Sequence, residues 1–338
     1  MCHIMAMEGK RRKAMKKQQF LYQKVSVLLL CLLIFDAGCS TQADVKTPAV
    51  TGEPISYVEP SFTDEPEFPG DFAVSEKTAS SEASSHDNIP EDPAMLSSYP
   101  PAVPGLHTLE NFLRTCLLPV GRTMYVWGGG WNEEDTGAGT EARTIGLSEN
   151  WKTFADLQDS DYDYKNTRYQ IHDGLDCSSY VGWVVYNTME NKNMKDGYVL
   201  KSTETAESYA SYGWGDYLPS GQAGRLKPGD IMSMKGHVWI CLGTCSDESV
   251  LLVHSSPPGV RICGTSSGDT ASQAVLLAEG LMKTYYPEWY SRYPQCSVST
   301  SYTENSSCMR WSTDIFPDAE TFQTMSAEEL ADVLWSPQ

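Results

Sequence analysis

The chain has 338 residues, of which 41% are hydrophobic, so it is long enough for one or two domains with a globular core. It carries 44 Asp and Glu residues against 25 Lys and Arg residues, a formal net charge of −19. Because phosphate binding needs basic surfaces, this balance argues against nucleic acid as a partner and is typical of a soluble protein that does not adhere to polyanions.

Residues 1–38 differ from the rest of the chain and have the organisation of an export signal. Seven basic side chains surround or precede an apolar stretch at residues 25–35, which is too short for a membrane-spanning helix of ~20 residues. The small residues 37–38 before Cys39 resemble a bacterial lipoprotein processing site, although Asp36 stands where an aliphatic residue is usual. We expect export, with lipidation of Cys39 attaching the protein to a membrane. Ordinary cleavage and an uncleaved anchor are the alternatives.

Residues 39–104 form the next region and read as a linker. From residue 40 onward this region holds ten of the 19 prolines and twelve acidic residues, without helical or strand periodicity. Low hydrophobicity with net negative charge cannot compensate the entropy of ordering. We interpret the region as a disordered acidic tether that lets an attached domain move above a membrane.

The predicted folded domain covers residues 105–338. Apolar periodicity predicts helices, and short β-branched or aromatic runs bounded by glycine and proline predict strands. Ser326 and Glu329 form a capping-box pattern at the start of the last helix. In chain order we expect a helix at 107–118, a β-like run at 125–130, an insertion with short elements of its own at 131–173, a buried helix at 178–191, four strands at 227–234, 237–243, 249–255 and 259–264, and helices at 269–286 and 326–335 within a C-terminal extension at 265–338.

Cys177 opens the predicted buried helix, and two histidines follow on predicted strands. His237 opens the second strand and His254 lies in the third, so the two lie on neighbouring strands of a hairpin. A helix N-terminus favours the thiolate form of a cysteine, and a histidine beside it can form an imidazolium–thiolate ion pair with it, as we expect for His237 and Cys177. A third polar group can orient that imidazole. This layout predicts an α+β, papain-like fold in which the helix bearing the nucleophile packs on an antiparallel sheet.

Four segments, "YVWGGG", "LDCSSYVGWV", "LKPGDIMSMKGHVWICLG" and "VHSSPPGV", together resemble successive motifs of the NlpC/P60 family of peptidoglycan endopeptidases. The resemblance covers residues 106–264 apart from the insertion. It implies an exported cysteine peptidase, without metal or cofactor, that cleaves peptidoglycan stem peptides at the bond from D-γ-glutamate to a diamino acid. We expect such an enzyme to be a monomer.

The resemblance also assigns roles to individual residues. Cys177 would be the nucleophile, His237 the base and His254 the third polar residue. On the substrate side it places Tyr125 beside the cleft, with Asp176 and Ser178 flanking the nucleophile. Asp176 is also expected to anchor the turn before the helix.

Two features depart from the family pattern. Ser179 stands where glycine is usual, from which we expect a small effect on close packing. The insertion lengthens the spacer before Cys177, which affects the expected specificity more than the chemistry.

Other interpretations remain open at this point. The same scaffold could serve an amidase that cuts between muramic acid and L-alanine, or a catalytically inactive wall-binding module. Cys177, His237 and His254 could instead bind zinc. His172 is an alternative base, which we disfavour because it precedes the helix and has no strand to position it.

The cysteines give no further constraint on the fold. If Cys39 is lipidated and Cys177 is a free thiol, six remain outside the signal, and sequence cannot choose among their pairings. We predict no disulfide framework for these six, which are Cys116, Cys241, Cys245, Cys263, Cys296 and Cys308.

Overall fold

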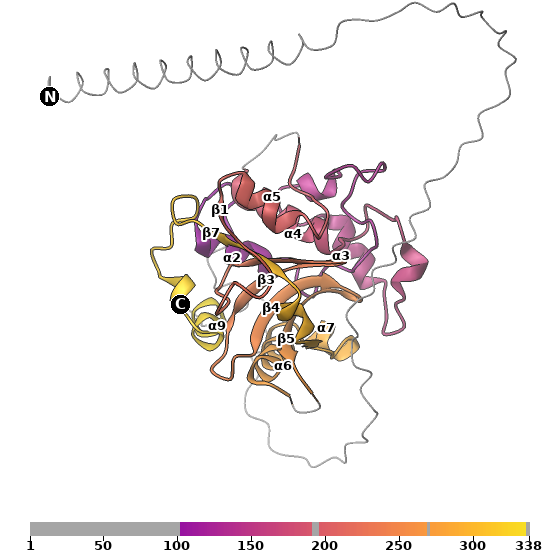
Figure 1. Cartoon of the computed structure of the whole chain (residues 1–338). Helices are drawn as coiled ribbons and strands as arrows, with labels where there is room; N and C mark the ends of the chain where they lie inside the picture. Colours follow the sequence, from indigo (N-terminus) through magenta and orange to yellow (C-terminus); the bar gives the residue numbers. More distant parts are fainter. Residues whose placement is uncertain (1–101, 191–195, 269–270, 336–338) are drawn as a thin grey trace, which may run out of the picture. The chain divides into compact units, whose positions relative to one another are not determined.

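The structure is a computed structural model that describes residues 102–190, 196–268 and 271–335 (Figure 1). The predicted export signal, Cys39 and residues 39–101 of the predicted linker lie outside the described residues. Among the helices described, none combines the length and the apolar character needed to cross a membrane.

The described residues form a mixed α+β fold, as expected. The α-helices are α2 (Leu109–Leu117), α3 (Glu149–Asp156), α4 (Cys177–Met189), α5 (Thr205–Ser211), α6 (Gln273–Tyr285), α7 (Pro287–Arg292), α8 (Ser301–Glu304) and α9 (Ala327–Trp335). The strands are β1 (Gly215–Leu218), β2 (Ile231–Met234), β3 (His237–Thr244), β4 (Val250–Ser256), β5 (Gly259–Ser266), β6 (Ser297–Ser299) and β7 (Ser307–Trp311). Three short 3-10 helices are η2 (Glu141–Arg143), η3 (Tyr164–Thr167) and η4 (Phe322–Thr324).

The strands form one sheet in the order β1-β7-β2-β3-β4-β5-β6. Strands β2 to β5 are a continuous antiparallel meander, and they confirm the four strands predicted from sequence. β6 joins parallel to β5, while β7 inserts between β1 and β2. Residues 297–311, which we call the C-terminal strand segment, are therefore integral to the sheet and not an appendage to it.

The β-like run predicted at residues 125–130 is wrong. Met124, just before it, makes an isolated bridge with Gly259, and Trp131, just after it, makes one with Ala138. Gly128 and Gly130 have φ values of 77° and 80°, which turn the chain out of an extended path at once. The prediction of a strand came from a short run of aromatic and β-branched residues, but the glycines that follow adopt positive φ and form a turn instead.

Side-chain alternation along the strands divides the core into two clusters. Val238 and Ile240 of β3 belong to a large cluster with helices α2, α4, α6 and α9. Trp239 and Cys241 point to the other face and belong to a smaller cluster with Tyr302 of α8. The two faces of β3 are thus covered by different parts of the chain: the helices on one side and the C-terminal strand segment on the other.

Specific polar contacts hold the C-terminal part in place. Arg310 of β7 pairs with the buried Asp230 before β2, with Nη2 2.6 Å from Oδ2. At α9, Ser326 N donates to Glu329 Oε2 at 2.8 Å and Glu329 N donates to Ser326 Oγ at 3.2 Å. The capping box predicted from sequence is confirmed.

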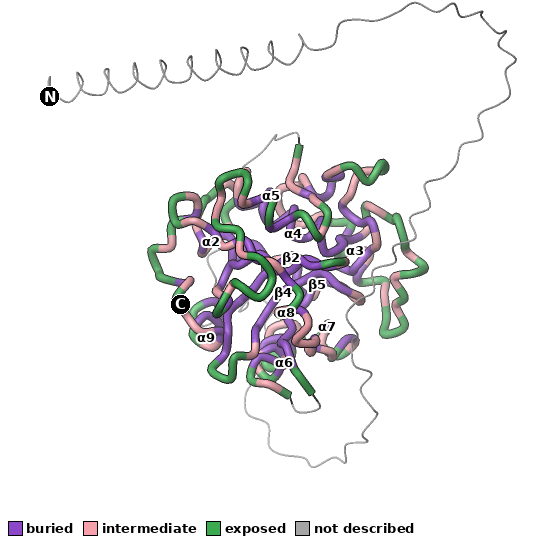
Figure 2. The backbone as a smooth tube through the Cα atoms, viewed as in Figure 1, coloured by how far each residue is buried: buried purple, intermediate pink, exposed green. Residues whose placement is uncertain are grey.

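The insertion at residues 131–173 carries η2, α3 and η3, as expected of a segment with short elements of its own. Buried Trp151 of α3 packs edge-on against Trp183 of α4, with ring centroids 5.7 Å apart. Figure 2 shows α4 buried, whereas much of the chain around it in the insertion is exposed. The insertion is thus anchored on the helix that begins with Cys177.

Candidate active site

Cys177 is the first residue of α4, as the sequence predicts. Asp176 is the N-cap: its Oδ1 accepts a hydrogen bond from Ser179 N at 2.8 Å. This satisfies one of the amides that a helix start leaves unpaired. The expected anchoring role of Asp176 is confirmed.

The glycine-rich turn packs directly against this helix start. Asp176 N donates to Gly129 O at 3.1 Å, and Ser179 Oγ donates to the same carbonyl. A Cβ on Gly130 would lie 2.6 Å from the Ser179 Cβ, so the close approach requires glycine there. Ser179, where the family pattern has glycine, thus adds a hydrogen bond across the contact.

The thiol of Cys177 lies against the beginning of β3. Its Sγ is 3.8 Å from Ser178 Oγ and 4.0 Å from the carbonyl oxygen of Gly236. A hydrogen bond from the Val238 backbone acts on the thiol as well, since it lowers the pKa. The sulfur therefore lies beside the backbone of the residue that precedes His237.

The two histidines form a buried pair. His237 Nε2 and His254 Nδ1 are 3.0 Å apart, and the rings meet edge-on at 82°. Both residues are fully buried. The pairing joins Nε2 of His237 to Nδ1 of His254 across the two neighbouring strands β3 and β4.

Two residues beside this pair were missed by sequence reasoning. Tyr302 of α8 has its ring centroid 5.2 Å from that of His237 and 5.8 Å from that of His254. Arg261 lies opposite His254 in the β4–β5 register, and its Nη1 donates to Ser256 O at 2.7 Å. Arg261 falls inside the strand predicted at 259–264, so a charged residue in a buried strand was an available signal. Nothing in the pattern around Tyr302 marked it.

Burial sets the protonation of the three central groups. It raises the pKa of Cys177 to about 12, with the carboxyl of Asp176 as a second cause. It lowers the pKa of His237 to about 3 and that of His254 well below its usual value, and the Arg261 guanidinium lowers both further. Burial therefore favours a neutral thiol and two neutral imidazoles at rest, and not the ion pair expected from the sequence.

Of the residues predicted on the substrate side, Asp176 and Ser178 flank the thiol, and both are mostly buried. Burial raises the pKa of Asp176 to about 7. Tyr125 is 1% exposed and packs edge-on against Tyr164 of the insertion at 5.5 Å. Burial raises the pKa of Tyr125 well above its usual value, and the nearby Cys177 and Asp176 groups raise it further. Substrate contact by these three residues stays a prediction.

His172 pairs with Glu141 of the insertion and is not part of the buried histidine pair. Its Nδ1 lies 2.6 Å from Glu141 Oε1, and its side chain is 58% exposed. Within the ranges that the structure describes, no group of three or more His, Cys, Asp or Glu side chains is arranged to hold a metal ion. The cysteines in those ranges, Cys177 included, are free thiols.

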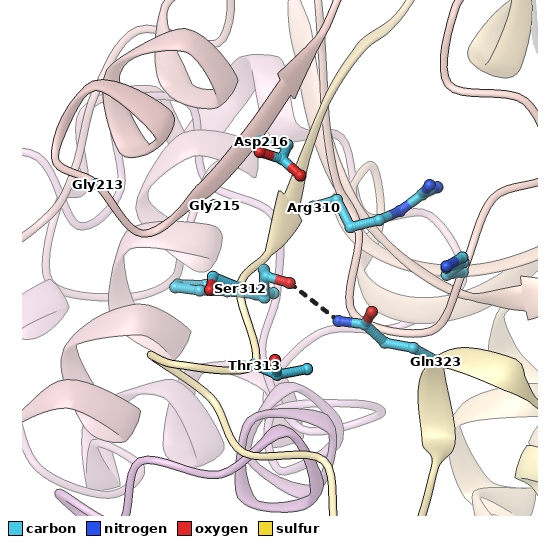
Figure 3. Close-up of a pocket in the computed structure, with 9 residues that line it drawn as sticks. Gly213, Gly215, Asp216, Arg310, Ser312, Thr313 and Gln323 are labelled. Carbon is cyan, nitrogen blue, oxygen red and sulfur yellow. Dashed lines mark hydrogen bonds between the residues drawn. The ribbon is translucent and has the colours of Figure 1, made fainter.

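Two hollows lie outside this centre. One of about 490 Å³ is a polar pocket between β1, the end of β7 and η4, in which Gln323 Nε2 donates to Trp311 O at 3.1 Å (Figure 3). Trp311 pairs with Gly215 of β1, at the opposite end of β7 from Ser307. Ser307 pairs with Ser233 of β2, which in turn pairs with Val238 near the start of β3, so the pocket lies away from His237. The other hollow, of about 410 Å³, is lined by residues 132–133 and 169–173 of the insertion.

Comparisons with known proteins do not identify the chain. No protein-family model, no curated protein and no solved structure matches it. The function of the site therefore rests on the chemistry of its own residues.

Proposed function

We propose that this protein is an exported cysteine peptidase of papain-like fold that hydrolyses amide bonds in peptidoglycan stem peptides. Cys177 is the nucleophile, His237 the general base and acid, and His254 the residue that orients His237. The bond we favour joins D-γ-glutamate to a diamino acid.

The observation that carries the proposal is the arrangement of three residues from three elements. A cysteine stands at the N-terminus of a buried helix, and its sulfur lies 4.0 Å from the carbonyl oxygen of Gly236, the residue before His237. That histidine is bonded at 3.0 Å to His254, whose place on the next strand makes the orientation of the ring rigid. A nucleophile, a base and an orienting group in this order are the components of thiol acyl transfer.

The first step forms a thioester. As Cys177 Sγ attacks the amide carbonyl carbon, the thiol proton passes to His237. His237 then delivers that proton to the leaving nitrogen as the C–N bond breaks. Because burial favours the neutral thiol and the neutral imidazole at rest, the proton moves as substrate is attacked and the pair does not rest as ions.

The second step releases the product. His237 takes a proton from water, the hydroxide attacks the thioester carbonyl, and the C–S bond breaks to give a carboxylate and the free thiol. The oxyanion in both steps is held by the backbone N–H of Cys177. The neighbouring amides of Ser178 and Ser179 are already engaged by the Asp176 carboxylate, which leaves the first amide of the helix for this role.

The substrate sets the location of the enzyme. Peptidoglycan lies outside the cytoplasmic membrane, so the proposed activity requires export through residues 1–38, with Cys39 as the point of attachment. A Cys39→Ser variant should move the protein from the membrane fraction to the soluble fraction, and an unchanged distribution would contradict lipidation.

The central test is digestion of purified peptidoglycan by the full-length protein, with mass spectrometry of the released fragments. The wild-type protein should release peptides whose masses show a new D-glutamyl end. The Cys177→Ala variant should release none, because the hydroxyl-free, thiol-free side chain cannot form the acyl intermediate.

A matched control is available in the same chain. Cys116 is also a buried free thiol, but it lies on α2 and its Sγ donates to Leu113 O. Cys116→Ala should keep the activity. If Cys177→Ala digests peptidoglycan as wild type does, the proposed mechanism is wrong.

The products also separate the two hydrolases that this scaffold could support. Intact stem peptides freed from the glycan would identify an amidase acting between muramic acid and L-alanine. No fragments from the wild-type protein would favour a wall-binding module instead.

A further inference from the structure

We propose that Tyr302 is a positioning residue for the histidine pair: its ring shields the pair from water and holds the two imidazoles in their hydrogen-bonded orientation. The proposal rests on the proposed roles of Cys177, His237 and His254. It adds a functional residue from the C-terminal strand segment, about 40 residues beyond the last motif that resembles a known family.

The geometry places Tyr302 over both rings at once. Its ring meets the His237 ring at 63° and the His254 ring at 62°, with centroids 5.2 Å and 5.8 Å away. Both interplanar angles are edge-on arrangements, which aromatic pairs prefer. Tyr302 is 1% exposed and the two histidines are fully buried, so the tyrosine lies in the wall that excludes solvent.

The backbone that carries this ring is tied to the strand that carries His237. Ser306 Oγ donates to the carbonyl of Tyr302 at 2.6 Å and accepts from Trp239 Nε1 at 3.3 Å. Trp239 lies two residues from His237 on the same face of β3. α8 also lies between β6 and β7, which are both strands of the sheet, so Tyr302 is fixed from both sides.

The groups that face the histidines explain what the wall does. Arg261 acts on both histidines from β5, and the ring of Tyr302 contacts both from α8. Burial is the first cause of the low pKa of His237, followed by the charge of Arg261. A cavity in place of the tyrosine ring would admit water, and water favours the protonated imidazole.

The test compares Tyr302→Ala and Tyr302→Phe in the full-length protein. NMR titration of the His237 and His254 ring signals measures protonation directly, without reference to any substrate. In Tyr302→Ala the His237 midpoint should rise by at least about one pH unit, whereas Tyr302→Phe should titrate like wild type because it keeps the ring.

Peptidoglycan digestion over a range of pH gives the second readout. Tyr302→Ala should lose about 10- to 100-fold in kcat/KM, the range typical when a residue that orients a functional side chain is removed. The acidic limb of the pH profile of kcat/KM should move to higher pH. Tyr302→Phe should restore both. A matched control is Tyr209→Ala, since Tyr209 is equally buried but lies on α5 and contacts Trp214 and Tyr212.

The outcomes are distinct. An unchanged His237 titration in folded Tyr302→Ala, or the same rise in Tyr209→Ala, would overturn the positioning role. If Tyr302→Ala does not fold, a Tyr302→Leu variant replaces it, and a wild-type titration there overturns the proposal in the same way. A wild-type protein without Cys177-dependent digestion would defeat the proposed function, while the NMR result would still decide the role of Tyr302.

Discussion

Two regions outside the four segments that resemble family motifs contact the candidate active site in different ways. The insertion at residues 131–173 lies on α4 through Trp151 and covers Tyr125 through Tyr164. The C-terminal strand segment enters the sheet itself and covers the histidines through Tyr302.

The difference separates two kinds of contribution. The insertion is added to the surface, so it can change what reaches the thiol without altering the sheet. The C-terminal strand segment pairs with β2 and β5, the strands on either side of β3 and β4, so it supports the two strands that carry His237 and His254. Three matched pairs of variants and one single variant would test this division.

The largest expected effect is at Arg310. Its guanidinium pairs with Asp230, which is 1% exposed, and Arg310→Ala would leave that carboxylate buried without its partner. Breaking a buried pair in this way costs about 3–5 kcal/mol of unfolding free energy. Urea unfolding measures it.

The matched control for Arg310 is Arg168 of the insertion, which is exposed and lies over the Trp127 ring at 5.9 Å. Arg168→Ala should change stability by less than about 1 kcal/mol. Equal losses in the two variants would contradict the distinction between the regions.

The next effect is the pH dependence of stability. The folded pKa values of His237 and His254 lie below the value near 6.5 of an unfolded histidine, so the unfolded chain binds more protons over that window. Acidification from about pH 6.5 toward 3 therefore costs up to about 1.4 kcal/mol per pH unit for each histidine.

His254→Gln should reduce the pH dependence of the unfolding free energy. The raised pKa of Asp176 contributes to that dependence with the opposite sign in both proteins, so it cancels in the difference between the variant and wild type. The control is His172→Gln in the insertion, where the side chain is 58% exposed. Urea unfolding at several pH values measures both variants. The prediction fails if His172→Gln changes the slope as much as His254→Gln does.

A smaller effect is expected at two helix caps. Ser326 and Glu329 exchange two hydrogen bonds at the start of α9, so Ser326→Ala should cost about 1 kcal/mol. Ser148 caps α3 of the insertion with a single bond of 3.3 Å to Asn150 N, and Ser148→Ala should cost less. Thermal unfolding of both variants would show the order, and the reverse order would contradict it.

The last effect, expected at Tyr164, is similar in size to that of a helix cap and falls mainly on kinetics. Its edge-on contact with Tyr125 is worth about 0.5–1.5 kcal/mol, and Tyr164→Ala removes it at a half-buried position. If the insertion controls access, this variant should change KM for peptidoglycan fragments more than kcat. A fall in kcat at constant KM would instead place Tyr164 in the chemical step.

Much of the fold could be predicted because its elements depend on local signals. The capping box at Ser326, the helix start at Cys177 and the meander of β2 to β5 follow from capping chemistry and from short apolar runs between turns. β1, β6 and β7 could not be predicted in the same way. They are three to five residues long, and their pairing depends on partners far away in the chain.

The sequence by itself determined which residues carry the chemistry that we propose: a cysteine at a helix start and two histidines on successive strands. Only the tertiary structure decided their surroundings. Strand alternation places His237 and His254 on the face that the C-terminal strand segment covers, and the insertion closes over Tyr125. The reason is physical: a helix cap or a strand run is stabilised by neighbours in sequence, whereas burial, and with it protonation, is set by whatever part of the chain packs on top.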